Sequence, residues 1–268
     1  MKKLTALVLA LLMAASLSLI VSANSDGNKW GDIPLYNGEI KLDGEIDPIY
    51  FDGLVIDIKD RRDAGKGATG TAYFLWGNNK LYVAVDVTDA DIVPVNPAVN
   101  TYKNESIEFV LDFLNKGDSK NAGKIMLSAE DNRLEYRYEA KEGCVKTACT
   151  MNDDGYIFEV IYDLSTQTFA APKAGVNYGI VLTLNDIQGK DTRTNTYSPS
   201  KNGAGTNDVA KYDYVTLSGT EVKLVEAPAK TDAPAASVKA PATADMGILA
   251  VIALAAAFGG AAVSGKRK

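Results

Sequence analysis

In TAYFLWGNNKLYVAVDVTDAD, residues 71–91, apolar side chains occupy every second position from Leu81 to Val87. Successive side chains of a β-strand point to opposite faces, so this period of two predicts a strand with one face against a core. The triplet Gly77-Asn78-Asn79 precedes it, and Gly and Asn favour tight turns because they tolerate left-handed backbone. The segment therefore predicts two strands joined by a turn.

The same alternation recurs along the chain. It covers residues 107–113, 158–162 and 180–184, and turn signals such as Asn115-Lys116-Gly117 and Asp153-Asp154-Gly155 separate the runs. No part of residues 33–219 has a sustained apolar stripe with the 3.6-residue period of a helix. We therefore predict one all-β domain over residues 33–219, an antiparallel β-sandwich of the jelly-roll or immunoglobulin-like kind.

The start of the chain predicts a secretory signal peptide, residues 1–23. Lys2 and Lys3 form a positive region, an apolar segment follows, and Val21-Ser22-Ala23 supplies the small residues of a cleavage site. We expect cleavage after Ala23, which leaves a polar leader at residues 24–32. An uncleaved signal anchor is the alternative.

The end of the chain predicts a membrane helix, within residues 240–268. Gly247 to Val263 contains no charged residue, and a basic stub, Lys266-Arg267-Lys268, follows it. Such an apolar run is close to the length that spans a bilayer, and positive residues stay on the cytoplasmic side. An Ala/Pro-rich linker at residues 220–239 separates this segment from the β domain. The domain is therefore expected outside the cell and tethered to it.

This terminal segment resembles the cell-wall sorting signals of Gram-positive bacteria. In those signals a Pro-x-Thr motif precedes the apolar span, and Pro241 and Thr243 occupy these positions. Ala240 and Ala244 replace the usual Leu and Gly. The resemblance implies sortase and peptidoglycan as partners, with cleavage after Thr243, and a permanent membrane anchor is the alternative.

Charge and residue usage narrow the function classes. The chain has a formal net charge of −6 and contains no histidine. An acidic surface disfavours nucleic acid as a partner, and the lack of histidine excludes Ser-His-Asp and Cys-His triads and histidine-ligated zinc or haem. Cys144 and Cys149 would lie about 16 Å apart on one strand, so a disulfide would need a tight turn between them. We expect two free thiols.

Five motifs in order carry a resemblance to a known family. They are LDGEIDPIYFDG from Leu42, TAYFLWGNNKLYVAVDVTDAD from Thr71, YKNESIEFVLDF from Tyr102, DGYIFEVIYDL from Asp154 and GVNYGIVLTLNDIQGKDTR from Gly175. Together they resemble the family 9 carbohydrate-binding modules and their relatives with the DOMON-like sandwich fold. The resemblance covers nearly all of residues 38–218 and implies the β-sandwich fold.

For the site, the resemblance implies a sugar ring held between two aromatic side chains, with polar groups on its hydroxyls. Tyr102 takes the position of the first aromatic residue and Glu108 that of the strand glutamate. The arginine position falls near Met126 and the second aromatic position near Thr206, so this half of the family's site is changed. Tyr197 or Tyr212 would supply the missing ring, whereas Trp76 and Tyr82 are expected to belong to the core.

The resemblance also implies a structural calcium ion, and no other cofactor is expected. Carboxylate oxygens are the ligands that calcium prefers. The candidate ligands cluster near the strand ends and are Asp86, Asp89, Asp91 and Asp112.

Non-catalytic binding of an extracellular glycan or oligosaccharide at the cell surface is the function we predict. The alternative is a surface structural or interaction protein on the same fold, with a degenerate sugar site. A glycoside hydrolase is disfavoured because it needs two carboxylates flanking one cleft, and Glu105 and Glu108 should face opposite sides of a strand. Haem binding is disfavoured by the absence of histidine.

Overall fold

The computed structural model describes residues 27–59, 67–166, 171–187, 193–197, 199 and 205–224, and of residues 193–197 only the backbone. The chain divides into two compact units, residues 1–225 and 226–268, and all described residues belong to the first. Its strands are β1 Lys29–Leu35, β2 Leu54–Ile58, β3 Thr69–Gly77, β4 Lys80–Thr88, β5 Ser106–Asp112, β6 Ala122–Ser128, β7 Leu134–Tyr138, β8 Val145–Asn152, β9 Gly155–Asp163, β10 Asn177–Ile187, β11 Arg193–Tyr197 and β12 Asp213–Glu221. Short 3-10 turns are η1 Pro48–Asp52, η2 Thr101–Lys103, η3 Ser119–Asn121, η4 Leu164–Thr166 and η5 Val209–Lys211.

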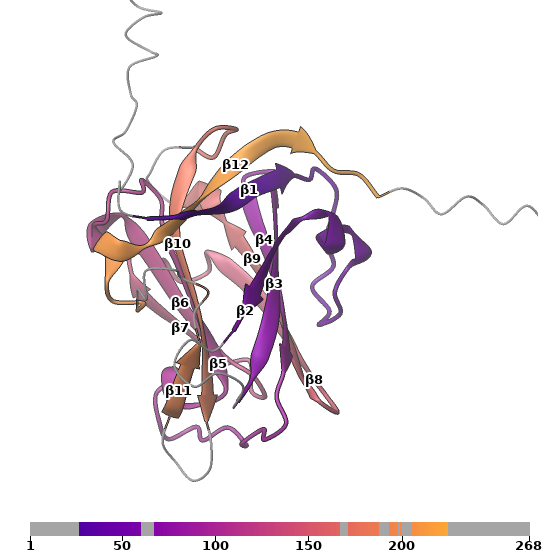
Figure 1. Ribbon diagram of the computed structural model, residues 1–268, viewed down its shortest axis with the longest axis vertical. Coiled ribbons are helices and arrows are strands. Elements are labelled where there is room, and N and C mark those ends of the chain that lie inside the picture. The colour runs from indigo at the N-terminus through magenta and orange to yellow at the C-terminus, as the bar shows by residue number, and fades with distance from the viewer. Residues whose placement is uncertain are drawn as a thin grey trace, which may run out of the picture. The chain divides into compact units, whose positions relative to one another are not determined.

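These strands form one sheet that curls over to make two facing layers (Figure 1). Its order is β7-β6-β5-β10-β12-β1-β3-β4-β9-β8, with β11 paired to β10 and β2 paired to β3. The all-β sandwich prediction is confirmed. The pairing is not antiparallel throughout, because β1 runs parallel to both β12 and β3. This strand lies where the two layers meet, and its sequence, KWGDIPL, lacks the alternation that identified the other strands.

The main core lies between the two layers. Phe74 of β3 packs on Phe109 of β5, with ring centroids 6.4 Å apart, and Phe113 meets Tyr162 of β9 at 5.8 Å. Trp76 is buried and donates its indole N–H to the carbonyl of Ser218 at 2.8 Å. Aromatic side chains from both layers therefore hold the curled sheet closed.

A second, smaller apolar cluster lies on the other side of β5, β6 and β10. The main core takes Ile107, Phe109 and Leu111 of β5, and Val110, between them in sequence, points the opposite way. Val110 packs there with Ala122 of β6, Val181 of β10, Val209 of η5 and Tyr212, which follows η5. All seven residues of β5 are therefore buried, and this outer face of the sheet is where polar side chains gather.

The terminal predictions lie outside the described residues: the signal peptide, the cleavage site after Ala23, and the sorting motif with Pro241 and Thr243. Within the described part of the chain, no helix is long and apolar enough to cross a membrane. Strand β1 begins at Lys29, inside the segment predicted as a leader, and β12 ends at Glu221. Cys144 and Cys149 are both free thiols.

Candidate functional site

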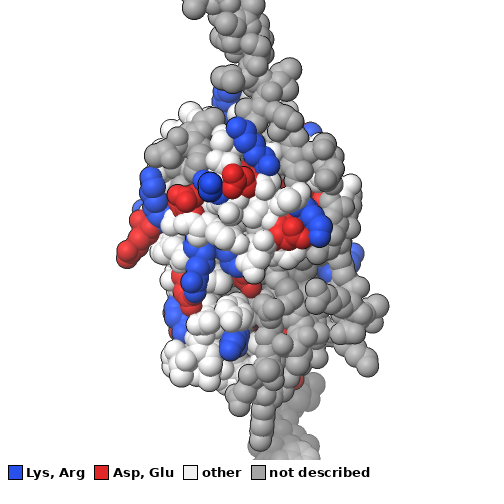
Figure 2. Space-filling model, turned by 90° about the vertical axis from the view of Figure 1, so that its left-hand side faces the viewer, with Lys and Arg blue, Asp and Glu red and all other residues white. Residues whose placement is uncertain are grey.

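A cavity of about 740 Å³ opens on the outer face of β5, β6, β7 and β10. Its volume is in the range of pockets that hold small ligands. The described lining comes from these strands, from η2 and from the loop at residues 205–208, and includes Tyr102, Glu108, Lys124, Tyr138 and Thr183. Figure 2 shows the molecule from the side of β6 and β7, where basic and acidic side chains are interspersed.

An ion pair forms the floor of this cavity. The carboxylate of Glu108 contacts the ammonium group of Lys124, and both side chains are more than nine-tenths buried. Thr206 accepts a hydrogen bond from Lys124 at 2.8 Å and donates one to Glu108 at 2.7 Å, and Asn185 donates to the other carboxylate oxygen at 3.2 Å. Burial opposes ionisation of Glu108, but the charge of Lys124 and these hydrogen bonds lower its pKa. The floor therefore carries one negative and one positive charge, and the pair has no net charge.

Tyr102 stands at the wall of the cavity, on η2. Its neighbour Thr101 is buried and fixed by Glu135 of β7, which accepts from the Thr101 backbone N–H at 3.0 Å and from its hydroxyl at 2.6 Å. The Tyr102 ring is partly exposed beside the floor pair. Tyr102 and Glu108 therefore line the same cavity.

The other two tyrosines expected at the site have different placements. Tyr212 is buried, and its hydroxyl donates to the carbonyl of Thr206 at 2.5 Å. Its ring packs in the outer apolar cluster beneath the loop, so it supports the cavity wall and offers no open face for stacking. Tyr197 ends β11 opposite Leu184, and its side chain lies outside the described part of the structure.

Tyr138 is the other tyrosine of the cavity lining, and no pattern in the sequence predicted it there. By the alternation of β7, Tyr138 should face the same way as Leu134 and Tyr136, which pack against the main core. Instead it adopts a left-handed backbone with φ of +56°, is 40% exposed and lines the cavity. A bulky residue rarely adopts this conformation. No feature of the local sequence predicts a left-handed backbone at Tyr138.

Thr183 of β10 was also missed. It lies directly opposite Glu108 in the antiparallel register and is 2% exposed. Thr183 belongs to the cavity lining, but its hydroxyl oxygen is buried and has no hydrogen-bond partner among the described residues. The alternation of residues 180–184 could have placed it on the outer face, but not beside Glu108.

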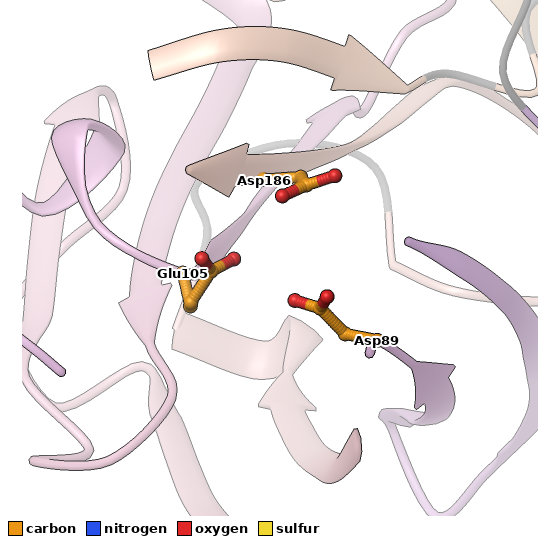
Figure 3. Close-up of side chains that lie close together, drawn as sticks. All are labelled: Asp89, Glu105 and Asp186. Atoms are coloured by element: carbon orange, nitrogen blue, oxygen red, sulfur yellow. The ribbon is translucent and has the colours of Figure 1, made fainter. Parts of the chain in front are cut away.

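A separate cluster of three carboxylates lies at the strand ends (Figure 3). Asp89 follows β4, Glu105 precedes β5 and Asp186 belongs to β10, and one oxygen of each lies within 4.8 Å of the others. All three are buried, and Figure 3 shows their carboxylates pointing toward one another. Burial raises the pKa of Glu105 to about 8, and the nearby charges of Asp89 and Asp186 add to this.

Only Asp89 of the four expected calcium ligands belongs to this cluster. Asp86 and Asp91 are exposed. Asp112 is buried but accepts hydrogen bonds from the backbone N–H groups of the turn after β5, from Leu114 at 3.1 Å and from Lys116 and Gly117 at 2.7 Å. It organises that turn. Glu105 and Asp186, the neighbours of Asp89 in this cluster, were not among the expected ligands, because their proximity arises from strand pairing. Calcium binding by Asp86, Asp91 or Asp112 stays a prediction.

The carboxylates Glu105 and Glu108 lie in different environments, as the strand alternation predicts. Glu105 accepts hydrogen bonds from the backbone N–H of Ile187 and from the hydroxyl of Tyr156, in the acidic cluster. Glu108 is held by Lys124 in the cavity floor. They do not form a pair that flanks one cleft.

Comparison with known proteins gives a consistent result. Residues 42–220 match the family described as carbohydrate family 9 binding domain-like. Among curated proteins, the chain is 26% identical over 185 residues to an endo-1,4-beta-xylanase A of Thermoanaerobacterium saccharolyticum and 28% identical over 156 residues to an exoglucanase of Acetivibrio thermocellus. The matches cover 65% and 57% of this chain but only 16% and 14% of those proteins.

Solved structures show the same fold. A family 9 carbohydrate-binding module of Caldicellulosiruptor kristjanssonii in complex with cellotriose has a TM-score of 0.58 and 21% identity, covering 72% of this chain and 97% of that one. A putative carbohydrate-binding protein of Bacteroides uniformis has a TM-score of 0.52 and 12% identity, covering 71% and 99%. At these identities the likeness concerns the fold.

Proposed function

We propose, from the premise that this chain belongs to the carbohydrate family 9 binding domain-like family, that its sandwich binds an extracellular glycan or oligosaccharide. The family consists of non-catalytic binding modules. The two hydrolases similar to this chain correspond to it over a small fraction of their length. The module therefore holds its ligand without changing it.

The observation that carries this proposal is the cavity that contains both Tyr102 and Glu108. A pyranose ring has one face of C–H groups that packs on an aromatic ring, while its hydroxyls need polar partners. Tyr102 supplies the ring, and the floor pair of Glu108 and Lys124 supplies a charged acceptor and a charged donor. Charged hydrogen-bonding groups make stronger hydrogen bonds than neutral ones.

A binding titration tests this function. Glucose, cellotriose and xylotriose are titrated into the purified residues 24–239, and we expect at least one to bind. Tyr102→Ala should weaken binding at least about tenfold, or about 1.4 kcal/mol. Phe51→Ala is the matched control, because Phe51 is an exposed aromatic residue outside the cavity lining. A wild type that binds no sugar of a broad glycan panel, or a Tyr102→Ala variant that binds as well as the wild type, contradicts the proposal.

A second candidate is a surface interaction protein with a degenerate sugar site. One observation favours it: Glu108 already has Lys124, Thr206 and Asn185 as partners, so a sugar hydroxyl must compete with them. A protein that is inert to the glycan panel but retains a wall polymer or a protein partner would support this function instead.

The acidic cluster fits a structural calcium ion. Its members Asp89, Glu105 and Asp186 offer hard oxygen ligands. Asp89 is 4% exposed, and its Oδ2 atom has no hydrogen-bond partner among the described groups. Buried carboxylates this close repel one another unless protons or a cation compensate them. We propose that calcium takes this place and joins the ends of β4, β5 and β10.

The two terminal segments support a location outside a Gram-positive cell. The proposed signal peptide, residues 1–23, directs export, and residues 240–268 tether the module at the surface. The linker at residues 220–239 would hold the module away from the membrane. Sortase would join Thr243 to peptidoglycan, and the alternative is that the apolar helix stays as the anchor.

A further inference from the structure

Tyr102 lies on a long connection between two strands. This connection joins β4 to β5 over residues 89–105, and η2, which carries Tyr102, lies near its end. Connections of this length are uncommon in compact domains, and many of them carry binding residues. The hydrogen bond from the Asn104 N–H to the Thr101 carbonyl, at 3.0 Å, shapes the turn but does not attach it to the sheet. The position of the Tyr102 ring relative to the sheet therefore depends on bonds that reach outside the connection.

Glu135 of β7 supplies two such bonds, and both go to the residue before Tyr102. Its Oε1 atom accepts from the Thr101 backbone N–H at 3.0 Å and from the Thr101 hydroxyl at 2.6 Å. Thr101 is 0% exposed. Buried donors without an acceptor cost stability, so removing the Glu135 carboxylate would force the turn to move until water or another group accepts these bonds. The Tyr102 ring would move with the turn.

The carboxylate of Glu135 is itself held from its other side. Its Oε2 atom accepts a hydrogen bond from Nη2 of Arg137 at 3.3 Å. By strand alternation both residues face away from the main core, in which the intervening Tyr136 and the preceding Leu134 pack. Burial opposes ionisation of Glu135, but the bonds from Thr101 and the charge of Arg137 lower its pKa. The carboxylate therefore has a fixed orientation and stays ionised at neutral pH.

Glu135 lies next to the cavity without belonging to its described lining. Met126, which is opposite Glu135 in the register of β6 and β7, does line the cavity, and so does Arg137. The two oxygens of Glu135 are directed to Thr101 and Arg137. Any effect of Glu135 on a ligand in the cavity must therefore pass through the residues that it holds.

We propose that Glu135 is a positioning residue of the binding site, which sets the place of the Tyr102 ring by holding Thr101. The inference rests on the proposed function and adds to it a residue that acts without touching the ligand. A side chain that is held in place before the ligand arrives loses less entropy on binding. Affinity for the ligand then depends on β7, the last strand on one side of the described sheet.

A double-mutant cycle separates positioning from a purely structural role. Glu135→Ala, Tyr102→Ala and the double variant of the module, residues 24–239, are titrated with glucose, cellotriose and xylotriose. Glu135→Ala alone should weaken binding about fivefold or more, within the range of coupling between groups of one hydrogen-bond network. In the Tyr102→Ala background the same change should alter the affinity by less than about twofold, because Glu135 acts through the Tyr102 ring.

Conservative and control variants accompany the cycle. Glu135→Gln keeps the Oε1 acceptor for both Thr101 bonds and should bind within about threefold of the wild type, whereas Thr101→Val loses the hydroxyl bond and should weaken binding about twofold to fivefold. Glu139→Ala is the matched control, because Glu139 is an exposed carboxylate just after β7 and outside the described lining. Hydrogen exchange over residues 98–106, measured without sugar, should be faster in Glu135→Ala than in the wild type and in Glu139→Ala.

The outcomes separate the two proposals. If the wild type binds no sugar, the proposed function fails and the inference falls with it. If Tyr102→Ala loses binding while Glu135→Ala retains it, the function stands and the inference is overturned. An equal loss from Glu135→Ala in both backgrounds also overturns it, because the residue then stabilises the fold and does not act through Tyr102. If Glu135→Ala does not fold, Thr101→Val decides: unchanged affinity and unchanged hydrogen exchange over residues 98–106 contradict the inference.

Discussion

Glu108 and Lys124 show how a buried charge pair can be maintained in an otherwise apolar sheet. Each lies on the outer face of its strand, and each has the other as its charged partner. Removing one partner of such a pair leaves the other charge buried and unpaired. This lowers the stability of the fold far more than replacing both partners does.

We therefore expect Lys124→Met to lower the free energy of unfolding by about 3–5 kcal/mol. The double variant Glu108→Gln/Lys124→Met should recover much of this loss, because it leaves no buried charge. Urea unfolding of wild type, both single variants and the double variant measures the coupling. Equal stability of the Lys124→Met variant and the wild type would show that the pair is solvated and does not form the cavity floor described above.

Glu159 of β9 is a buried carboxylate that makes the stability of the fold depend on pH. It is 0% exposed and accepts hydrogen bonds from the backbone N–H groups of Gly44 at 2.7 Å and Asp43 at 3.1 Å. Burial, with smaller contributions from the charges of Asp43 and Asp47, raises its pKa from 4.5 to about 7. Between these values the folded protein holds a proton that the unfolded chain has released, so stability falls as pH rises.

Glu159→Gln should remove this part of the pH dependence. The variant should be more stable than the wild type at pH 8 by about 1–3 kcal/mol and should approach it near pH 4. The comparison uses the difference between the two unfolding curves, because the raised pKa of Glu105 adds a slope in the same direction to both proteins. Glu142→Gln, a change at an exposed position, should leave the curve unchanged. A parallel pH profile for Glu159→Gln and wild type would contradict the expectation.

At the scale of elements, the chain crosses from one half of the sheet to the other between β4 and β5. Asp89 lies at the beginning of this connection and Glu105 at its end, and the carboxylate of Asp186 of β10 is close to both (Figure 3). Backbone N–H groups also converge here: Ala68 donates to Asp186 at 2.9 Å and Ile187 to Glu105 at 3.0 Å. A cation at this point would join both ends of the β4–β5 connection to β10, which is distant in sequence.

Calcium in the millimolar range should raise the melting temperature of the metal-free module. At a concentration 100 times the dissociation constant the gain is about 2.7 kcal/mol. Asp89→Asn and Glu105→Gln should each lose most of the response, whereas Asp91→Asn, a change at an exposed neighbour, should keep it. A wild type with no response to calcium, or an Asp91→Asn variant that loses the response, would refute the site.

The strands differ in how far their sequences alone predicted them. The hairpin of β3 and β4 was predictable because its apolar period and its turn lie in one short segment. Strand β1 was not, because its partners β12 and β3 lie at opposite ends of the domain sequence and its side chains do not alternate cleanly. Strand β7 has only five residues, and its alternation ends at Tyr138, where the backbone turns left-handed.

At the scale of the whole molecule, the proposed tether makes a separable prediction. In a Gram-positive host, full-length protein should remain with the cells, and a chain that ends at residue 239 should appear in the medium. If sortase joins Thr243 to peptidoglycan, muramidase digestion releases the wild type, and Thr243→Ala shifts it to the detergent-soluble membrane fraction. If the helix is a permanent anchor, both forms are detergent-soluble. If the shortened chain stays on the cells and this retention is not due to glycan binding, the terminal tether is contradicted.

The sequence by itself determined the class of the fold and one half of the site. Period-two alternation and turn residues act between near neighbours in the chain, so an all-β sandwich, the outward position of Glu108 and the separation of Glu105 from it could be predicted. The tertiary structure alone decided which groups meet: Lys124 with Glu108, Thr183 and Tyr138 with the cavity of Tyr102, and Glu105 and Asp186 with Asp89. These groups come from different strands of one curled sheet, and their proximity depends on strand order, register and curl. Those properties arise from long-range pairing and core packing, which no local pattern encodes.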